Sequence, residues 1–360
     1  MDADERIVIL TTPSNPDGVR LHIEHMIESK GKNINLLMKQ VPTLSDAIEL
    51  LDQAVGDLVA VSPEQWDEVK EDRFTLVGIL PRREPTWVLV SDNNPEHLIH
   101  QPKLVCDSEL VMRQFLRLRK DVTFTSSSEI LKGQDEYNSP KERWMSIEQM
   151  RLQGSIDGYI IPRSLYGLLH KRVRRHTLGI QRGQPKGVRE HFIPPPLHGF
   201  SLLIGRVGFQ SKMVDSLLHA PSLLAYQTEM LLKQNLPEEL STITGVFVEQ
   251  RKLGVLMKES KQNDEGFFER FYINSEKKPI RKGPQFEVIL EAINEDATVS
   301  FGCYKVIEID ALRLGAINIL KEFESIYKQL NTDFEPILRA PEGLPDEYKA
   351  GKKRLFKPHN

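Results

Sequence analysis

The sequence predicts an α/β protein, and three observations support this fold class. Short apolar runs alternate along the chain with longer segments whose apolar residues recur at helical spacing, which is the pattern of β-α-β units. The chain has 360 residues, a length typical of two or three domains. Its hydrophobic content of 39% suits an ordinary globular core. We therefore expect layered sheets and helices, with a largely parallel sheet at the start of the chain.

The first expected α/β unit begins with a strand over residues 7–10 and a helix that ends near Gly31. A strand over 35–38 follows, and Ser45 is expected to cap a helix over 47–55, because its hydroxyl can accept a bond from a free first-turn N–H. Gly56 then ends that helix. Four further apolar runs are short enough for buried strands: residues 58–61, 76–80, 87–90 and 200–204.

Two more α/β units are expected beyond the polar stretch 91–102. The second has strands over 104–106, 122–124 and 158–161, and helices over 108–118, 147–152 and 164–169. The third follows a long helix over 223–234, with strands over 245–248, 253–258, 267–273 and 301–307 and a helix over 312–330. The predicted domains are residues 1–92 with 192–215, then 93–191, then 220–330, followed by a C-terminal tail over 331–360.

Composition excludes several classes of protein. The 48 Lys and Arg residues nearly balance the 51 Asp and Glu residues, so a net charge of -3 gives no global reason to bind nucleic acid. No apolar run is long enough for a membrane helix, and the acidic start of the chain does not resemble a secretory signal. The two cysteines, Cys106 and Cys303, exclude a disulfide framework. We expect a cytoplasmic protein with both thiols reduced.

Motifs of common enzymes are absent from the sequence. There is no P-loop, no G-x-G-x-x-G, no H-E-x-x-H and no G-x-S-x-G. The histidine pairs 170/176 and 191/198 lack a third ligand nearby, so no metal site is predicted.

Residues 170–191 carry the strongest local charge bias, and Lys171 and Arg172 lie at their start. One interpretation is a solvated, flexible insertion. The other is a contact with an anion or polycarboxylate, since clustered cations focus positive potential. Nucleic acid is not the expected partner, because no aromatic residues are interleaved to stack on bases.

Read in order, several segments resemble the porphobilinogen deaminase family, also called hydroxymethylbilane synthase. The family's T-R-x-S corresponds to residues 11–14, D-x-A-V-H-S-x-K-D to 57–65, R-E-D-P-R-D to 79–87, V-G-T-S-S-L-R-R to 105–112, G-E-Y-D-A-I-I-L to 154–161, L-P-A-x-G-Q-G to 193–199 and L-E-G-G-C-x-x-P-I-G to 236–245. The resemblance implies two hinged domains like those of periplasmic binding proteins, plus a smaller third α/β domain. It also implies a link to tetrapyrrole biosynthesis and a site between the first two domains.

The residues that carry the family's chemistry are replaced here. Leu240 stands where the family attaches its dipyrromethane primer to a cysteine, so this cofactor is not expected. Gln65 replaces the catalytic aspartate, and an amide is neither a base nor an anion at neutral pH. Val111 and Met112 replace the arginines that clamp the primer's carboxylates. No catalytic residue is therefore assigned.

Some polar residues persist at the positions that the resemblance places in the cleft. The candidate ligand-binding residues are Thr11, Ser14, Ser62, Gln65, Ser108, Arg113, Arg117, Lys171 and Arg172. The hydroxyl residues among them have a structural alternative, since Ser and Thr are common at strand ends and helix caps.

Three hypotheses for function follow. The first is a deaminase-like pseudoenzyme that binds a ligand or partner through the cleft. The second is an enzyme of tetrapyrrole or related biosynthesis with altered chemistry, in which Glu64 supplies a carboxylate and Arg113 or Arg117 a positive charge. The third is a module that binds a small solute by hinge closure. The expected ligand is a small molecule, an anionic pyrrole or a polycarboxylate, and no membrane partner is expected.

Overall fold

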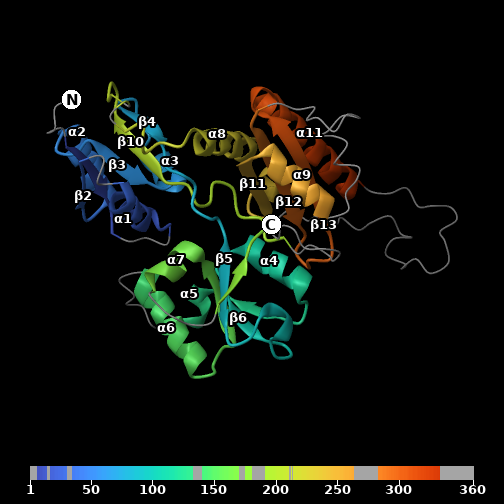
Figure 1. Ribbon diagram of the computed structural model, residues 1–360. Helices are drawn as coiled ribbons and strands as arrows, with labels where there is room; N and C mark the ends of the chain where they lie inside the picture. Colours follow the sequence, from blue (N-terminus) through green and yellow to red (C-terminus); the bar gives the residue numbers. More distant parts are fainter. Residues whose placement is uncertain are drawn as a thin grey trace. The chain divides into compact units, whose positions relative to one another are not determined.

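The computed structural model (Figure 1) describes residues 6–13, 17–30, 35–132, 140–169, 175–180, 191–210, 212, 214–262 and 283–332. The chain divides into two compact units. Unit 1 comprises Met1–Asp107, Asp121–Ile180 and Leu197–Gln227, and unit 2 comprises Ser108–Lys120, Gln181–Pro196 and Thr228–Asn360.

The first sheet of unit 1 has the strand order β2-β1-β3-β10-β4. Its strands are β1 (Ile7–Thr11), β2 (Leu36–Gln40), β3 (Leu58–Val61), β4 (Phe74–Ile79) and β10 (Leu202–Arg206). The three strands that come first are parallel, whereas β10 is antiparallel to β3 and β4, so the sheet is mixed rather than largely parallel. The late strand β10 returns to this sheet and lies between β3 and β4, and a strand at residues 200–204 was expected from the sequence.

Three helices belong to the first sheet: α1 (Val19–Lys30), α2 (Leu44–Asp52) and α3 (Pro63–Val69). The cap of α2 differs from the prediction. Thr43 is the N-cap rather than Ser45: its Oγ1 accepts a bond from the Asp46 N–H, and the Asp46 carboxylate accepts one from the Thr43 N–H. This reciprocal capping box starts the helix earlier than expected. The core between helices and sheet is aliphatic, and Ile9, Ile23 and Leu58 are fully buried in it.

The second sheet of unit 1 has the order β7-β6-β8-β5-β9. Its strands are β5 (Trp87–Ser91), β6 (Lys103–Val105), β7 (Thr123–Thr125), β8 (Gly158–Pro162) and β9 (Arg175–Leu178), and the helices α5 (Ser127–Ile130), α6 (Pro140–Leu152) and α7 (Arg163–Leu168) follow its strands. A short 3-10 helix, η1, spans Pro95–His97. Trp144, Tyr159 and Leu165 lie in the core of this sheet.

Two strands of this sheet differ from the sequence analysis. β5 pairs with β8 and β9, although the analysis placed it with residues 1–92 in the first domain. β9 lies inside the expected basic loop 170–191, because Arg175–Leu178 pairs along β5 and so satisfies its backbone groups. The domain boundaries themselves stay a prediction.

Unit 2 contains an antiparallel three-stranded sheet of β11 (Thr244–Arg251), β12 (Gln285–Ile293) and β13 (Ser300–Glu308). Its helices include α4 (Glu109–Leu118), α9 (Leu253–Gln262) and α11 (Leu312–Asn331), and the helix α8 (Ala220–Asn235) is shared by both units. Unit 2 also contains the short 3-10 helices η3 (Glu238–Leu240) and η4 (Ile309–Ala311). α11 packs along β13, where the rings of Phe301 and Phe323 have centroids 4.6 Å apart.

The predicted strand over 253–258 is wrong, since these residues form the helix α9. Leu253, Leu256 and Met257 recur at helical spacing, and so short an apolar run does not distinguish helix from strand. The strand β12 was not predicted, and the predicted strand over 267–273 lies outside the described residues. The predicted tail over 331–360 lies outside them as well, apart from its first two residues.

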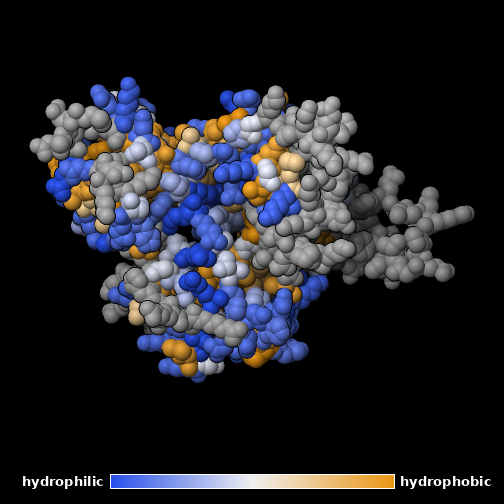
Figure 2. Space-filling model, in the orientation of Figure 1, coloured by the Kyte–Doolittle hydropathy of each residue, from blue (hydrophilic) through white to orange (hydrophobic). Residues whose placement is uncertain are grey.

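The protein is thus a mixed α/β structure with two five-stranded sheets and a smaller three-stranded sheet, which confirms the predicted α/β fold class. The coloured surface in Figure 2 is mostly hydrophilic, with apolar residues in small scattered groups. Across the described ranges, no helix is both long enough and apolar enough to cross a membrane.

Candidate functional site

The carboxyl ends of parallel strands are where open α/β sheets bind ligands, at the point where the strand order reverses. In the first sheet this point lies between β1 and β3, because the chain moves to one side for β2 and then crosses to the other side. Thr11 ends β1 there, and Ser62 follows β3. The side chain of Thr11 is 1% exposed, and its Oγ1 has no hydrogen-bond partner within the described structure.

The second sheet has its reversal between β6 and β8. Arg163 and Ser164 follow β8 directly and begin α7. Polar residues of unit 1 are therefore present at both reversal points, and those after β8 line a cavity.

This cavity has a volume of about 250 Å³ and lies entirely within unit 1. Four segments form it: the start of α1, the connection between β4 and β5, the start of α7, and the turn before β10. The lining residues are Asp17, Gly18, Leu21, His22, His25, Arg83, Glu84, Arg163, Ser164, Gly167, His198 and Gly199.

Gly18 permits the close approach of three of these segments. Its φ of +67° lies in the left-handed region, which favours glycine. A Cβ at this position would lie 2.4 Å from Nη1 of Arg83 and 2.5 Å from Cβ of Ser164. The start of α1 can therefore meet both other segments only where residue 18 has no side chain.

Arg83 is the central cation of the cavity. Its Nη2 donates to the backbone carbonyl of Asp17, whereas its Nε is buried and has no acceptor among the residues that the structure describes. Burial lowers the pKa of Arg83, and the charge of Asp17 acts in the opposite direction. The guanidinium is thus desolvated with one donor unused, which costs free energy unless an acceptor arrives.

Two histidines beside Arg83 are neutral at neutral pH. Burial and the charge of Arg83 lower the pKa of His22 to about 4, and its Nδ1 lies 3.0 Å from Oγ of Ser201. Burial together with the charges of Arg82 and Arg83 lowers the pKa of His198 to about 3. Both shifts reflect a desolvated region of positive potential.

His198 is held from two sides. Its ring stacks on Trp87, with centroids 5.7 Å apart and planes 15° apart. Its backbone carbonyl accepts bonds from Nε and Nη2 of Arg82, at 3.0 and 2.8 Å. The Arg82 guanidinium in turn lies 4.1 Å from the ring centroid of Phe200, a cation–π distance. Arg82 therefore fixes the backbone at His198.

Two carboxylates are the negative groups of the lining. Burial raises the pKa of Asp17, and its Oδ1 accepts the N–H of Val19 at 2.9 Å. Glu84 lies 3.4 Å from Nη1 of Arg163, and both side chains are partly exposed. The charges of Arg163 and Glu84 offset one another. Arg83 is instead near Asp17, and burial disfavours the ionised form of that carboxyl group.

The predicted pair Ser62 and Gln65 is brought together as a helix cap. Oγ of Ser62 accepts the Gln65 N–H at 3.3 Å, and Oε1 of Gln65 accepts the Ser62 N–H at 3.0 Å. Gln65 thus has a capping role at α3 that an aspartate would also perform. Ser14, Lys171 and Arg172 lie outside the described residues.

The predicted residues Ser108, Arg113 and Arg117 lie on α4 in unit 2, where each has a structural partner. Ser108 caps the helix. Arg113, 5% exposed, donates to the carbonyl of Ile293 at 2.9 Å and pairs with Glu109. Arg117 pairs with Glu291 and donates to the carbonyl of His191, both at 2.6 Å. Their role in ligand binding stays a prediction.

The expected primer position carries a buried aliphatic side chain. Leu240 is 0% exposed and ends the turn η3. The free thiols Cys106 and Cys303 are buried, and burial raises the pKa of Cys303 to about 11. The Cys303 thiol therefore lacks the environment of an activated nucleophile. In the described part of the chain, no group of three or more His, Cys, Asp or Glu residues is arranged to hold a metal ion.

Sequence reasoning missed Arg83, His22, His198 and Arg163 as site residues. Arg83 and His198 lie inside segments that were matched to the deaminase family, but no role was assigned to them. The spacing of His22 and His25 placed them on one helix face, which was a weak signal.

The fold is a mixed α/β architecture with a cavity in unit 1, and its likeness to solved structures is weak. The chain is similar to an ABC transporter structure from Parabacteroides distasonis at 10% identity and a TM-score of 0.37, over 90% of this chain and 94% of that one. It is similar to a putative methionine-binding lipoprotein from Bacillus subtilis at 10% identity and a TM-score of 0.32, over 62% and 93%.

A third likeness is to the OxyR regulatory domain from Pseudomonas aeruginosa, in its reduced form, at 13% identity and a TM-score of 0.30, over 59% and 91%. No protein-family model matches the chain, and no curated protein matches it either. Identities and TM-scores this low assign no function to the chain.

Proposed function

We propose that the protein binds a small ligand carrying an acidic group in the cavity of unit 1. The observation that carries this proposal is the unused Nε donor of Arg83, buried beside Asp17, His22 and His198. A ligand carboxylate would accept from it, and such charge-assisted bonds are worth about 1.5–3 kcal/mol. This is the small-solute module among the hypotheses from the sequence.

The surrounding groups support an acidic ligand rather than a cation. Burial and the charge of Arg83 hold both nearby histidines neutral, and the charge of Arg82 adds to this effect at His198. Burial also disfavours the ionised form of Asp17. The potential at the Arg83 donor therefore attracts an anion.

Thermal-shift measurements on the full chain test the proposal. The panel comprises porphobilinogen, amino acids, simple mono- and dicarboxylates and inorganic phosphate. A binder at 100 times its dissociation constant stabilises the folded state by about 2.7 kcal/mol. We expect at least one acidic compound to raise the unfolding temperature and Arg83→Met to abolish that rise.

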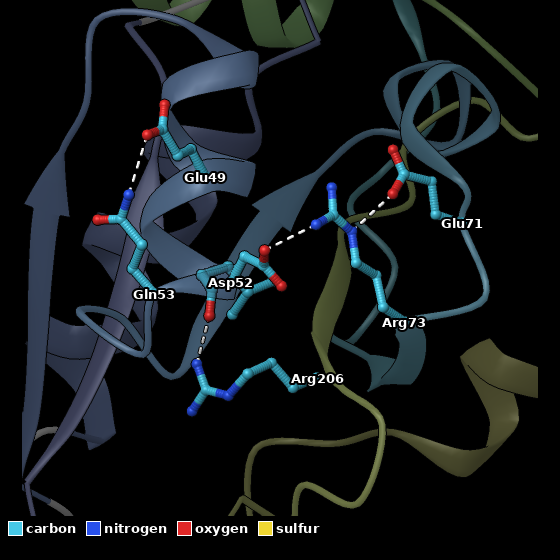
Figure 3. Close-up of polar contacts among 7 residues, drawn as sticks. Glu49, Asp52, Gln53, Glu71, Arg73 and Arg206 are labelled. Carbon is cyan, nitrogen blue, oxygen red and sulfur yellow. Dashed lines mark hydrogen bonds and ion pairs between the residues drawn. The ribbon is translucent and has the colours of Figure 1, made fainter.

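Arg73 provides a matched control in the same unit. Figure 3 shows its guanidinium between Asp52 and Glu71, with both ion pairs at 2.7 Å. Its side chain is 52% exposed and it does not line the cavity. Arg73→Met should preserve every ligand-induced shift. A panel without any hit, or hits equally present in Arg83→Met, would overturn the proposal.

A second candidate is a deaminase-like protein without deaminase activity. It rests on the sequence resemblance, and the full burial of Leu240 is compatible with it, because an aliphatic side chain cannot carry the primer's thioether. Mass spectrometry of the purified chain should show no dipyrromethane adduct, and porphobilinogen should not be consumed. An adduct or turnover would exclude this candidate. The altered-chemistry enzyme gains less support, since Arg113 and Arg117 already bind carbonyls and carboxylates.

A further inference from the structure

We propose that His22 is a second ligand-binding residue of the cavity, and that Ser201 positions it as a hydrogen-bond donor to the acid group of the ligand. This inference rests on the proposed function and deepens it for the same site. It depends on which ring nitrogen of His22 carries the proton, and the hydrogen bonds around that ring decide this.

The hydroxyl of Ser201 has one partner among the residues that the structure describes. Ser201 is 0% exposed, and its Oγ lies 3.0 Å from Nδ1 of His22. A hydroxyl has one hydrogen to donate and two lone pairs that can accept. Buried donors are almost always paired, whereas an oxygen with a spare lone pair is more common. The Ser201 O–H therefore donates to Nδ1 of His22.

The other ring nitrogen of His22 is then the donor. Burial, together with the charges of Arg83 and His25, lowers the pKa of His22 to about 4, so the ring is neutral at neutral pH. A neutral imidazole carries one proton, and this proton lies on Nε2 when Nδ1 accepts a bond. His22 is half-buried and lines the cavity, and its Nε2 forms no hydrogen bond with the described residues. The Nε2–H group can therefore donate to a ligand.

A second histidine–serine pair in unit 1 shows the same contact with its direction fixed. Nδ1 of His219 accepts the backbone N–H of Ser222 at 3.3 Å, and Oγ of Ser222 accepts the N–H of Arg82 at 2.8 Å. Because this Nδ1 is an acceptor, the Ser222 hydroxyl donates to it over 2.8 Å. His219 is thus an internal reference for a histidine whose Nδ1 accepts a bond from serine.

The cavity then offers two N–H donors of different kinds. Nε of Arg83 is charged and buried without an acceptor in the described structure, and Nε2 of His22 is neutral. Both residues line the cavity. A deprotonated acid group has oxygens that only accept, so it can take a bond from each donor. Such a group satisfies both donors, whereas a group that itself donates towards His22 leaves two hydrogens facing one another.

NMR of the imidazole nitrogens of the full chain tests the tautomer without any ligand. At about pH 8, above the ordinary histidine pKa of about 6.5, His22 and His219 should both show the Nε2–H tautomer. Their signals are assigned by their loss in His22→Gln and His219→Gln. Ser201→Ala should convert His22 to a mixture of tautomers and leave His219 unchanged. A proton on Nδ1 of His22 in the wild type, or no effect of Ser201→Ala, overturns the proposal.

Two substitutions of His22 test the bond to the ligand. Gln can place an amide N–H near the position of Nε2, whereas the shorter Asn reaches only the position of Nδ1. The probes are acetate, succinate, porphobilinogen and inorganic phosphate, titrated on the full chain. For each probe whose binding depends on Arg83, His22→Asn should raise the dissociation constant at least about tenfold, as loss of a bond to a charged group implies. His22→Gln should retain most of the affinity, and Arg73→Met all of it.

The remaining outcomes separate this inference from the proposed function. If a probe binds in an Arg83-dependent way but His22→Asn leaves its affinity unchanged, the role of His22 is overturned and the proposed function stands. Equal losses in His22→Asn and His22→Gln also overturn it, because a donor at the position of Nε2 then makes no difference. If no probe depends on Arg83, the ligand contact of His22 fails together with the proposed function.

Discussion

Arginines in two regions of this protein have opposite environments. On α4 in unit 2, Arg113 and Arg117 donate to the carbonyls of Ile293 and His191 and pair with Glu109 and Glu291. In the cavity of unit 1, Arg83 donates to one carbonyl and keeps a buried Nε without an acceptor in the described structure. Arg113 and Arg117 use their donors within the fold, whereas Nε of Arg83 can still donate to a further acceptor.

The difference shows that an arginine's function depends on how many of its donors the protein itself uses. A guanidinium has five N–H donors in a fixed plane, so its unused donors define where a ligand acid must lie. Arg113 and Arg117, which the sequence offered as candidate ligand-binding residues, are those whose partners are internal.

The largest effect on stability is expected from a substitution of Arg113 on α4. Arg113→Met keeps the length of the side chain but leaves the buried carbonyl of Ile293 without its donor. The free energy of unfolding should fall by about 2 kcal/mol, measured by urea denaturation. Ligand-induced shifts should persist. An unchanged stability would contradict the structural role assigned to Arg113.

A smaller loss of stability is expected from a substitution of Gly18, whose backbone lines the cavity. Gly18→Ala places a Cβ at φ +67° and within 2.5 Å of Arg83 and Ser164. The positive φ alone costs about 1–2 kcal/mol. Thermal unfolding should show this loss together with a loss of ligand binding. Gly254→Ala is a control, because a Cβ there meets no described atom within 4 Å and the residue lies in a helix. Equal effects of both substitutions would argue against the close approach at Gly18.

Low pH should destabilise the protein, because His22 is neutral in the folded state. The folded-state pKa of His22, about 4, lies below the ordinary value of 6.5, so the unfolded chain binds the extra proton between these values. Stability from this group is therefore full above pH 6.5 and is lost as the pH falls towards 4. After allowance for partial exposure, the loss should be roughly 1 kcal/mol. His22→Asn should flatten the pH dependence of the unfolding temperature. The same slope in wild type and variant would disprove this assignment.

A weaker effect on stability is expected for Arg83 itself. Arg83→Met removes a desolvated charge and one bond to the Asp17 carbonyl, and these changes oppose one another. The free energy of unfolding should change by less than about 1 kcal/mol, while binding of an acidic ligand is lost. Urea denaturation and ligand titration measure the two quantities separately. A stability loss as large as that of Arg113→Met would place Arg83 in the structural group.

The smallest effect is expected for the exposed cluster in Figure 3. Arg73→Gln removes ion pairs to Asp52 and Glu71 at the surface. Exposed pairs contribute about 0–1 kcal/mol, so the unfolding temperature should hardly move. Added salt should reduce even this difference, and a large loss would indicate that exposure alone does not separate the two groups of arginines.

Several elements were predictable because their signals are local. The apolar runs at residues 7–10, 58–61 and 158–161 are strands, and the helical spacing of Leu320, Phe323 and Tyr327 marks α11. The helix α9 was mistaken for a strand because its apolar run is short. The strand β9 was not predicted. It lies in a stretch of strong positive charge that is typical of a loop, and its pairing with β5 depends on a segment distant in sequence.

The candidate site was less predictable than the fold. Ser62 and Gln65 were predicted to bind a ligand, which stays a prediction, and in the structure they contact one another as a helix cap. Arg83 lies in the segment 79–87. No role was assigned to it, since nothing adjacent in the sequence distinguishes it from Arg82. Their difference arises from segments that meet in space: Arg82 reaches the carbonyl of His198, and Arg83 reaches Asp17.

The sequence by itself determined the α/β class, the leucine at residue 240 and the absence of an acid at residue 65. These properties depend on residue identity and short-range periodicity, which the chain carries without folding. Only the tertiary structure decided which arginine keeps an unused donor and which histidines are neutral. Both depend on burial and on partners distant in sequence, and Gly18 brings those partners together by letting α1 meet Arg83 and Ser164.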